Sequence, residues 1–66
     1  MKVWVSTVTA SNYVWITSSQ EIMWEHLALF TTEESARADN TQILHRALEE
    51  GYEDSSAEVF EMEVKA

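Results

Sequence analysis

The segment KVWVSTVTA, residues 2–10, sets the architecture of this chain, because β-branched and aromatic residues dominate it and the first good helix former comes only at its end. The segment NYVWIT, residues 12–17, has the same strand-forming character. The link between them, Ser11-Asn12, is short enough for a tight turn. We therefore expect two antiparallel strands joined as a hairpin.

A helix start signal follows these strands. The sequence Ser18-Ser19-Gln20-Glu21 forms a capping box, in which a hydroxyl accepts from the third helical amide while Glu21 reaches back to the first. Glu21 and Glu25 lie opposite an apolar stripe at helical spacing, which consists of Met23, Trp24, Leu27, Ala28 and Phe30. We expect a helix over residues 21–30. Because short apolar runs are ambiguous, a third strand over the same residues stays open as the alternative.

The middle of the chain predicts a second helix. Residues 31–38 (TTEESARA) form either the tail of the first helix or a new start capped at Thr31. The run Asp39-Asn40-Thr41-Gln42 repeats the capping logic, and Gly51, the one glycine of the chain, supplies a natural end. Between them lies an apolar stripe made of Ile43, Leu44, Ala47 and Leu48.

Strict alternation marks the last element as a half-buried strand from Ala57 to Val64. The element order is then ββααβ. This order most simply gives an α+β fold in which a three-stranded antiparallel sheet carries two helices on one face, and the last strand pairs with an edge of the hairpin. No linker, repeat or low-complexity tract divides the elements, so we expect residues 1–66 to form a single domain.

The register of this expected sheet decides which side chains the helices cover. We expect the covered face to hold Val3, Val5, Thr7, Thr9, Val14 and Ile16 together with Phe60, Met62 and Val64. The other face would carry Ser6 and Val8 and show solvent an aromatic and acidic set: Trp4, Tyr13, Trp15, Val59, Glu61 and Glu63. Aromatic residues with carboxylates at their rim are typical of protein-binding surfaces. In the alternative, the tryptophans are buried in the small core or under residues 31–38.

Charge limits the possible partners. The chain has 12 acidic and 4 basic residues, which gives a formal net charge of -8. So few basic residues cannot neutralise a phosphate backbone, so direct binding of DNA or RNA is not expected, and a basic protein surface is the natural complement. The acidic residues form a block without an intervening base near the carboxyl end: Glu49, Glu50, Glu53, Asp54, Glu58, Glu61 and Glu63.

We interpret this acidic block as partner-binding, together with Trp4, Tyr13 and Trp15. Such a block can steer the protein toward a basic groove or imitate the phosphates of a nucleic acid. The alternative interpretation is an ordinary solvated face that keeps a small protein soluble.

The sequence offers little for catalysis. No spacing of His26, His45 and carboxylates resembles a metal-ligand motif, and the absence of cysteine excludes thiolate zinc sites and disulfides. A sheet with two short helices offers no obvious cleft in which a side chain would become a general acid or base. We expect no enzymatic activity, no metal and no cofactor, and the histidines to lie at the surface or its rim.

The compartment is expected to be the cytoplasm. No apolar stretch approaches the roughly 20 residues that a membrane-spanning helix needs. Met1-Lys2-Val3 runs directly into the strand pattern without an apolar signal segment, and the lack of cysteine is typical of reducing compartments. We therefore expect no membrane partner.

The order of these segments resembles that of a broad class of small proteins. The resemblance is carried by Met1-Lys2-Val3-Trp4-Val5, by Tyr13-Val14-Trp15, by residues 39–51 and by the alternating strand from Ala57 to Val64. In this pattern the chain is similar to short acidic proteins encoded by bacteriophages and mobile elements. The resemblance implies an inhibitor: an anti-CRISPR protein, an anti-restriction protein that mimics DNA, or a protein that takes over host RNA polymerase. The most DNA-like mimics carry denser acid than this chain.

Two functions from different classes follow. The first is a phage-type inhibitor that docks its acidic end, with Trp4 and Trp15, on a basic surface of a host protein complex in the host cytoplasm. The second is a structural or assembly module whose sheet edge or aromatic face forms a homodimer and completes a thin core. An enzyme would require a pocket that contains both His26 and His45.

Overall fold

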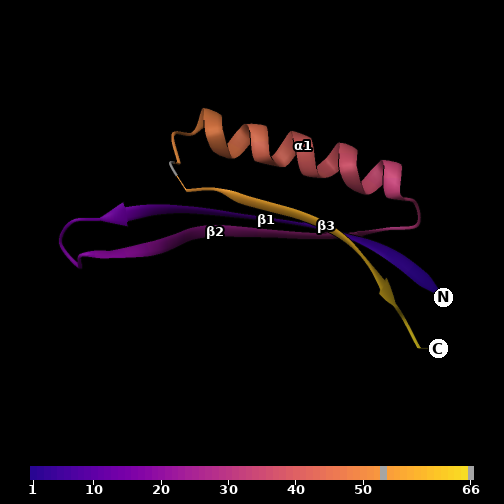
Figure 1. Ribbon diagram of the computed structural model, residues 1–66. Helices are drawn as coiled ribbons and strands as arrows, with labels where there is room; N and C mark the ends of the chain where they lie inside the picture. Colours follow the sequence, from indigo (N-terminus) through magenta and orange to yellow (C-terminus); the bar gives the residue numbers. More distant parts are fainter. Residues whose placement is uncertain (53, 66) are drawn as a thin grey trace.

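The computed structural model describes residues 1–52 and 54–65. Its elements are β1 (Lys2–Val14), β2 (Ser19–Phe30), α1 (Glu33–Glu49) and β3 (Ser56–Glu63). β1 lies between β2 and β3 and pairs antiparallel with both, so the expected three-stranded antiparallel sheet is confirmed. Figure 1 shows α1 lying along one side of the sheet. The fold is α+β, but the order is ββαβ, and the prediction of two helices is wrong.

The helix α1 begins earlier than the capping run at Asp39. Thr32 is its N-cap, and the Oγ1 atom of Thr32 accepts a hydrogen bond from the backbone N–H of Ser35 at 3.2 Å. Glu33 and Glu34 occupy the first turn, where the helix dipole favours negative charge. The alternative of a new start within residues 31–38 is therefore confirmed, with the cap at Thr32 instead of Thr31, and a start at Asp39 is wrong.

Helix α1 ends just before Gly51, the one glycine of the chain, as the sequence predicts. Gly51 has a φ of 89°, a conformation that glycine adopts without strain. Its N–H donates to the carbonyl of Leu48 at 3.1 Å, while the N–H of Tyr52 donates to the carbonyl of Ala47 at 3.3 Å. These two bonds form a Schellman motif, which satisfies the last carbonyls of the helix.

α1 covers the face of β1 that carries Ser6, Val8 and Ala10. The amide Nδ2 of Asn40 in α1 donates to Ser6 Oγ at 3.2 Å, and His26, which lies opposite Val8 in the ladder, contacts α1 through its side chain. The contact is made by small, fully buried residues, among them Ala36 and Ala47 of the helix. Small side chains on both sides allow the helix to approach the sheet closely.

The predicted covered face is the wrong one. Val3, Val5, Thr7 and Thr9 point away from α1, because they alternate with Ser6, Val8 and Ala10 along the strand. The predicted grouping across the strands is confirmed for β3, since Val3 lies opposite Met62 and Val5 opposite Phe60. It is wrong for Val14, which belongs to β1 itself and alternates with Val3 and Val5, and for Ile16, which lies in the turn. The physical reason for the error is that both faces of β1 carry apolar side chains, so composition alone does not choose between them.

β1 is one continuous strand where two short ones were expected. The chain reverses at residues 15–18, and Ser18 has a φ of 52°. Ser11 is buried within the strand, where its hydroxyl donates to the carbonyl of Asp54 and accepts from Nε2 of Gln20. The Ser11-Asn12 pair therefore marks a polar site that the fold satisfies with hydrogen bonds, and the hairpin predicted there is wrong.

Residues 21–30 belong to β2, so the expected first helix is wrong and the alternative strand is confirmed. The cross-strand partners put Trp24, Ala28 and Phe30 on the face that α1 covers and Leu27 and Leu29 on the other. A strand that is apolar on both faces loses the period of two that distinguishes it from a helix. This loss produced the misleading helical stripe.

The hairpin of β1 and β2 extends beyond the helix as a two-stranded arm. β3 pairs with β1 only as far as Thr9, whereas β2 pairs with β1 as far as Val14. The register shifts between Ala10 and Ser11, which increases the local twist where the arm leaves the sheet. Figure 1 shows the tip of this arm, residues 15–18, projecting past the end of α1. We refer to residues 11–22 as the hairpin arm.

Candidate functional site

The side of the sheet opposite α1, which we call the open face, is uncovered by any described element. Its half nearest the chain termini is apolar, and we call this the apolar half: it consists of Met1, Val3, Val5, Leu27, Leu29, Phe60, Met62 and Val64. Leu27 and Leu29 expose 68% and 54% of their surface, whereas Val5 between the flanking strands exposes only 2%. The side chains of the flanking strands cover the central strand and are themselves exposed to solvent. The apolar half is therefore a thin hydrophobic layer.

The other half of the open face is polar and acidic, and we call it the acidic half. Thr7 and Thr9 occupy its centre on β1, with Glu58 opposite Thr7 on β3 and Glu25 opposite Thr9 on β2. Glu25 and Glu58 lie on opposite sides of the central strand and two residues apart along it, so strand geometry puts their Cα atoms about 12 Å apart. In the part of the chain that the structure describes, neither carboxylate forms an ion pair.

The hairpin arm adds an exposed aromatic and aliphatic tip. Trp15 and Ile16 expose 83% and 96% of their surface, and Ile22 and Met23 are also exposed. Tyr13 and Trp15 contact each other edge to face, with ring centroids 5.0 Å apart. Exposed Tyr and Trp that are held in one geometry by mutual contact are typical anchors of protein-binding surfaces.

The predicted acidic block is spread along the molecule. Glu49 and Glu50 lie at the end of α1, Asp54 and Glu58 lie near the start of β3, and Glu61 and Glu63 lie at its other end. Glu53 lies outside the described residues. The block follows the length of β3 because that strand runs from the end of the helix back toward the amino terminus, as Figure 1 shows.

Several of these carboxylates have a basic partner within the chain. Glu49 contacts His45 at 3.2 Å, Glu50 contacts Arg46 at 3.3 Å, Glu61 contacts Lys2 at 3.5 Å and Glu63 contacts the terminal amine at 3.4 Å. Exposed pairs of this kind contribute at most about 1 kcal/mol each, so these acids can still exchange their partners. Within residues 1–52 and 54–65, the acids that form no ion pair are Glu21, Glu25, Glu34, Asp54 and Glu58.

The predicted aromatic cluster does not form as one surface. Trp4 is half-buried on the face that α1 covers, opposite Phe30 in β2 and Glu61 in β3. Val59 is on that covered face too, because it lies opposite Ser6. Tyr13 near the end of β1 and Trp15 in the turn that follows both lie on the hairpin arm. For Trp4 the alternative of a tryptophan in the small core agrees with the structure, whereas Trp15 is exposed at the arm's tip, where it contacts Tyr13.

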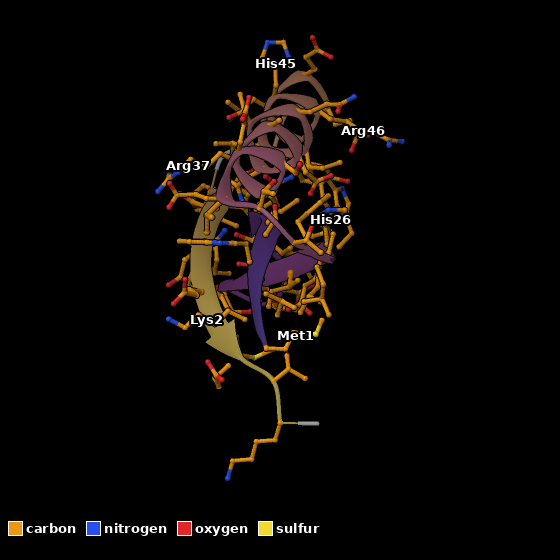
Figure 2. All side chains as sticks on the ribbon, turned by 90° about the vertical axis from the view of Figure 1, so that its right-hand side faces the viewer. Met1, Lys2, His26, Arg37, His45 and Arg46 are labelled. Carbon is orange, nitrogen blue, oxygen red and sulfur yellow. The ribbon has the colours of Figure 1, made fainter. Side chains whose placement is uncertain are left out.

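A groove of about 300 Å³ runs between α1 and β2, and the polar groups of Trp24, Arg46 and Glu50 in its lining are joined to one another. The Nε1 atom of Trp24 donates to Glu50 at 3.2 Å, and Arg46 contacts the same carboxylate. His26 at its wall contacts Asp39 at 2.8 Å. Figure 2 shows His45 on the outer side of the helix, away from His26. The two imidazoles therefore do not share a site, and the groove is a region of structural contacts.

Sequence reasoning missed Leu27, Leu29 and Glu25 as members of a surface. They were assigned to a helix, although the alternation of Trp24, His26, Ala28 and Phe30 with these residues fits a strand. The open alternative of a strand over residues 21–30 contained the necessary signal, because it puts Leu27 and Leu29 on the same side of a sheet.

The described part of the chain has no helix with the length and apolar character that crossing a membrane requires. Comparison of the chain with protein-family models, with curated proteins and with solved structures finds no match.

Proposed function

We propose that this chain is a small binding protein of the phage inhibitor type, which docks on a basic surface of a host protein complex. The observation that carries the proposal is the unpaired acidic half of the open face beside the aromatic hairpin arm. Glu25 and Glu58 flank Thr7 and Thr9 without a neutralising side chain among the described residues. Such an arrangement fits a partner that supplies the positive charge.

The charge balance of the molecule supports this choice. The side chains of Lys2, Arg37 and Arg46 each contact a glutamate of the chain itself, at 3.5, 3.6 and 3.3 Å respectively. The formal net charge of -8 therefore resides on carboxylates that these bases do not offset. A field of this size accelerates association with a basic surface and falls with rising salt.

The hairpin arm supplies the contact that charge alone lacks. Charged rims govern orientation and the association rate, whereas aromatic anchors that are buried on binding supply most of the affinity. Tyr13 and Trp15 are the exposed aromatics of this kind, and they lie near the end of the strand that leads out of the acidic half and in the turn that follows it. We therefore assign the acids to steering and the aromatic pair to anchoring.

The resemblance to acidic phage proteins gives the class of target. Complexes that bind nucleic acids, such as CRISPR effectors, restriction enzymes and RNA polymerase, expose basic grooves that an acidic protein can occupy. The inhibitor would then act by occluding such a groove. If its carboxylates imitate nucleic-acid phosphates, DNA or RNA should compete with it for the same groove.

Affinity capture from a bacterial lysate tests this proposal. Immobilised wild-type chain should retain a protein with a basic surface, and retention should fall at least about tenfold for Glu25→Gln/Glu58→Gln, since two charge contacts are lost. The matched control is Glu33→Gln/Glu34→Gln, which removes the same charge from the first turn of α1 and should retain the protein. A second variant, Trp15→Ala, should weaken retention at every salt concentration.

Three results would count against the proposal. Equal loss in both double variants would show that net charge acts without a defined site. Retention that does not change in any variant would remove both the acidic half and the arm from the binding surface. Retention of proteins without a basic surface would exclude the proposed class of partner, and competition by added DNA would separate mimicry from other modes of occlusion.

A further inference from the structure

The apolar half of the open face has no role in the function proposed above. A basic surface complements carboxylates, whereas the apolar half, in the described strands, meets an acid only at its border, where Glu58 lies across Thr7 from Leu27. Leu27, Leu29, Phe60 and Met62 all lie exposed there. Contiguous exposed apolar side chains on a small domain mark a surface that another molecule covers.

The molecule is more extended than a compact domain of its size. The accessible surface is 4820 Å², whereas a compact monomer of 7.6 kDa exposes about 4300 Å². The radius of gyration is 13.8 Å, compared with about 11 Å for a typical domain of this length. The projecting hairpin arm (Figure 1) and the uncovered open face both contribute to this excess.

We infer that a second copy of this chain covers the apolar half, with the two sheets stacked face to face and their strands antiparallel. This inference goes beyond the proposed function, because it concerns assembly and does not require the host partner. The apolar half is complementary to itself, since apolar side chains on each copy lose contact with water when the faces stack. A two-fold axis through the region between Val3 and Val5 produces such an isologous contact.

Charge selects the antiparallel arrangement. Glu25 and Glu58 lie at one end of the open face, and the apolar half lies at the other. A parallel stack would bring the carboxylates of both copies together in a desolvated interface, which is unfavourable. An antiparallel stack that overlaps the apolar halves separates these acids, and the two hairpin arms then project from opposite ends of the dimer.

The area predicts a weak dimer. From Met1 to Val5, before the row that holds Thr7 and Glu58, the apolar half is about 13 Å long and about 14 Å wide, given the rise per residue and the spacing of strands. This is smaller than a standard interface, which buries about 800 Å² on each partner. We therefore expect association that depends on concentration, with a Kd between about 10 and 500 μM, and a folded monomer at high dilution.

Sedimentation equilibrium of the wild-type chain between about 1 μM and 1 mM tests this inference. The mass should rise from one chain to two across this range. Leu29→Asp introduces a charge at the centre of the apolar half and should keep the chain monomeric at all concentrations. Ile22→Asp is the matched control, because Ile22 is an exposed residue of the same strand that lies on the hairpin arm, and this variant should dimerise like the wild type.

Circular dichroism of each variant separates lost association from lost folding. If Leu29→Asp fails to fold, the wild-type dilution series and Leu27→Asp decide the question, since Leu27 is even more exposed. A wild-type chain that stays monomeric up to 1 mM would overturn the inference and would assign the apolar half to a different partner. A folded Leu29→Asp variant that still dimerises, or an Ile22→Asp variant that does not, would also overturn it.

These outcomes are independent of the proposed function. Sedimentation uses the chain alone, so a monomer can still bind a basic host protein, and a dimer can exist without one. Capture with the folded monomeric variant then shows whether the host partner requires two copies.

Discussion

Val8 and Val5 lie three residues apart on the central strand, point to opposite faces, and are almost equally inaccessible to solvent, at 1% and 2%. Val8 is covered by a separate element, α1, which packs on that face of the sheet (Figure 1). Val5 is covered only by side chains of the two neighbouring strands, Leu29 and Phe60 among them. A buried residue therefore does not prove that its face of the sheet is covered by another element. Neighbouring side chains on the same face can shield a central residue and still expose apolar surface to solvent.

The two faces also treat polar groups differently. On the covered face, Nδ2 of Asn40 contacts Ser6 Oγ at 3.2 Å and the backbone carbonyls of Thr7 and Glu58 at 3.0 Å each, so one amide joins α1 to two strands. On the open face, the carboxylates of Glu25 and Glu58 have no such partner among the described residues. Polar groups thus stabilise the fold on one side and remain available for binding on the other.

Asn40→Asp should produce the largest effect on this comparison. The substitution replaces a donor with a charged acceptor that faces two carbonyl oxygens in a half-buried site, and we expect a loss of about 3 kcal/mol in the free energy of unfolding. For a domain of this size such a loss leaves little folded protein. Urea unfolding followed by circular dichroism measures the change.

Gln42→Glu is the control for this variant, because it adds the same charge at an exposed position of the same helix and should change the free energy of unfolding by less than about 0.5 kcal/mol. A similar loss for both variants would mean that negative charge on α1 is destabilising in general. The bridge made by Asn40 would then have no special part in holding the helix on the sheet.

A pair of truncations compares the two faces directly. Val8→Ala should lower the free energy of unfolding by about 2 kcal/mol, because the cavity is enclosed between helix and sheet. Val5→Ala should lower it by only about 1 kcal/mol in the monomer, because the exposed side chains around it can move into the space. Urea unfolding of both variants at high dilution gives the two values.

The same pair sharpens the dimer inference. At high protein concentration the loss caused by Val5→Ala should grow, because the second copy prevents neighbouring side chains from relaxing, while the loss caused by Val8→Ala should stay constant. An equal loss for both variants at every concentration would contradict the difference between a covered and an open face.

The sequence predicted those parts of the fold whose pattern is local. The alternation of Phe60, Met62 and Val64 predicted β3 to within one residue, and the position of Gly51 predicted the end of α1. Both signals depend on a few neighbouring residues and on backbone geometry that needs no knowledge of the rest of the molecule.

The remaining errors have one physical origin. Because β2 carries apolar side chains on both faces, its pattern loses the period of two, and a helix was assigned in its place. Because β1 also carries apolar side chains on both faces, the sequence does not show which face α1 covers. Trp4 was therefore predicted on the exposed face, whereas the structure has Leu29 on that face and Trp4 on the face that α1 covers. In a chain that leaves an apolar face of its sheet uncovered, the rule that apolar residues point to the core does not identify the core.

The smallest expected effect concerns the acidic half. Glu25→Gln/Glu58→Gln should raise the free energy of unfolding by about 0.3 kcal/mol, since it removes two unpaired charges from a chain with a net charge of -8. The gain should disappear in about 0.5 M NaCl, where such repulsion is screened. Urea unfolding at low and high salt measures both values.

Glu33→Gln is the matched control, because Glu33 forms an ion pair with Arg37 at 3.6 Å and its loss should lower the stability slightly or leave it unchanged. A loss of more than about 1 kcal/mol in the Glu25→Gln/Glu58→Gln variant would mean that these carboxylates stabilise the fold. A small gain in stability combined with lost capture of the host protein would instead indicate that Glu25 and Glu58 serve binding and not folding. Residues that bind a partner can do so at the expense of the stability of the isolated chain.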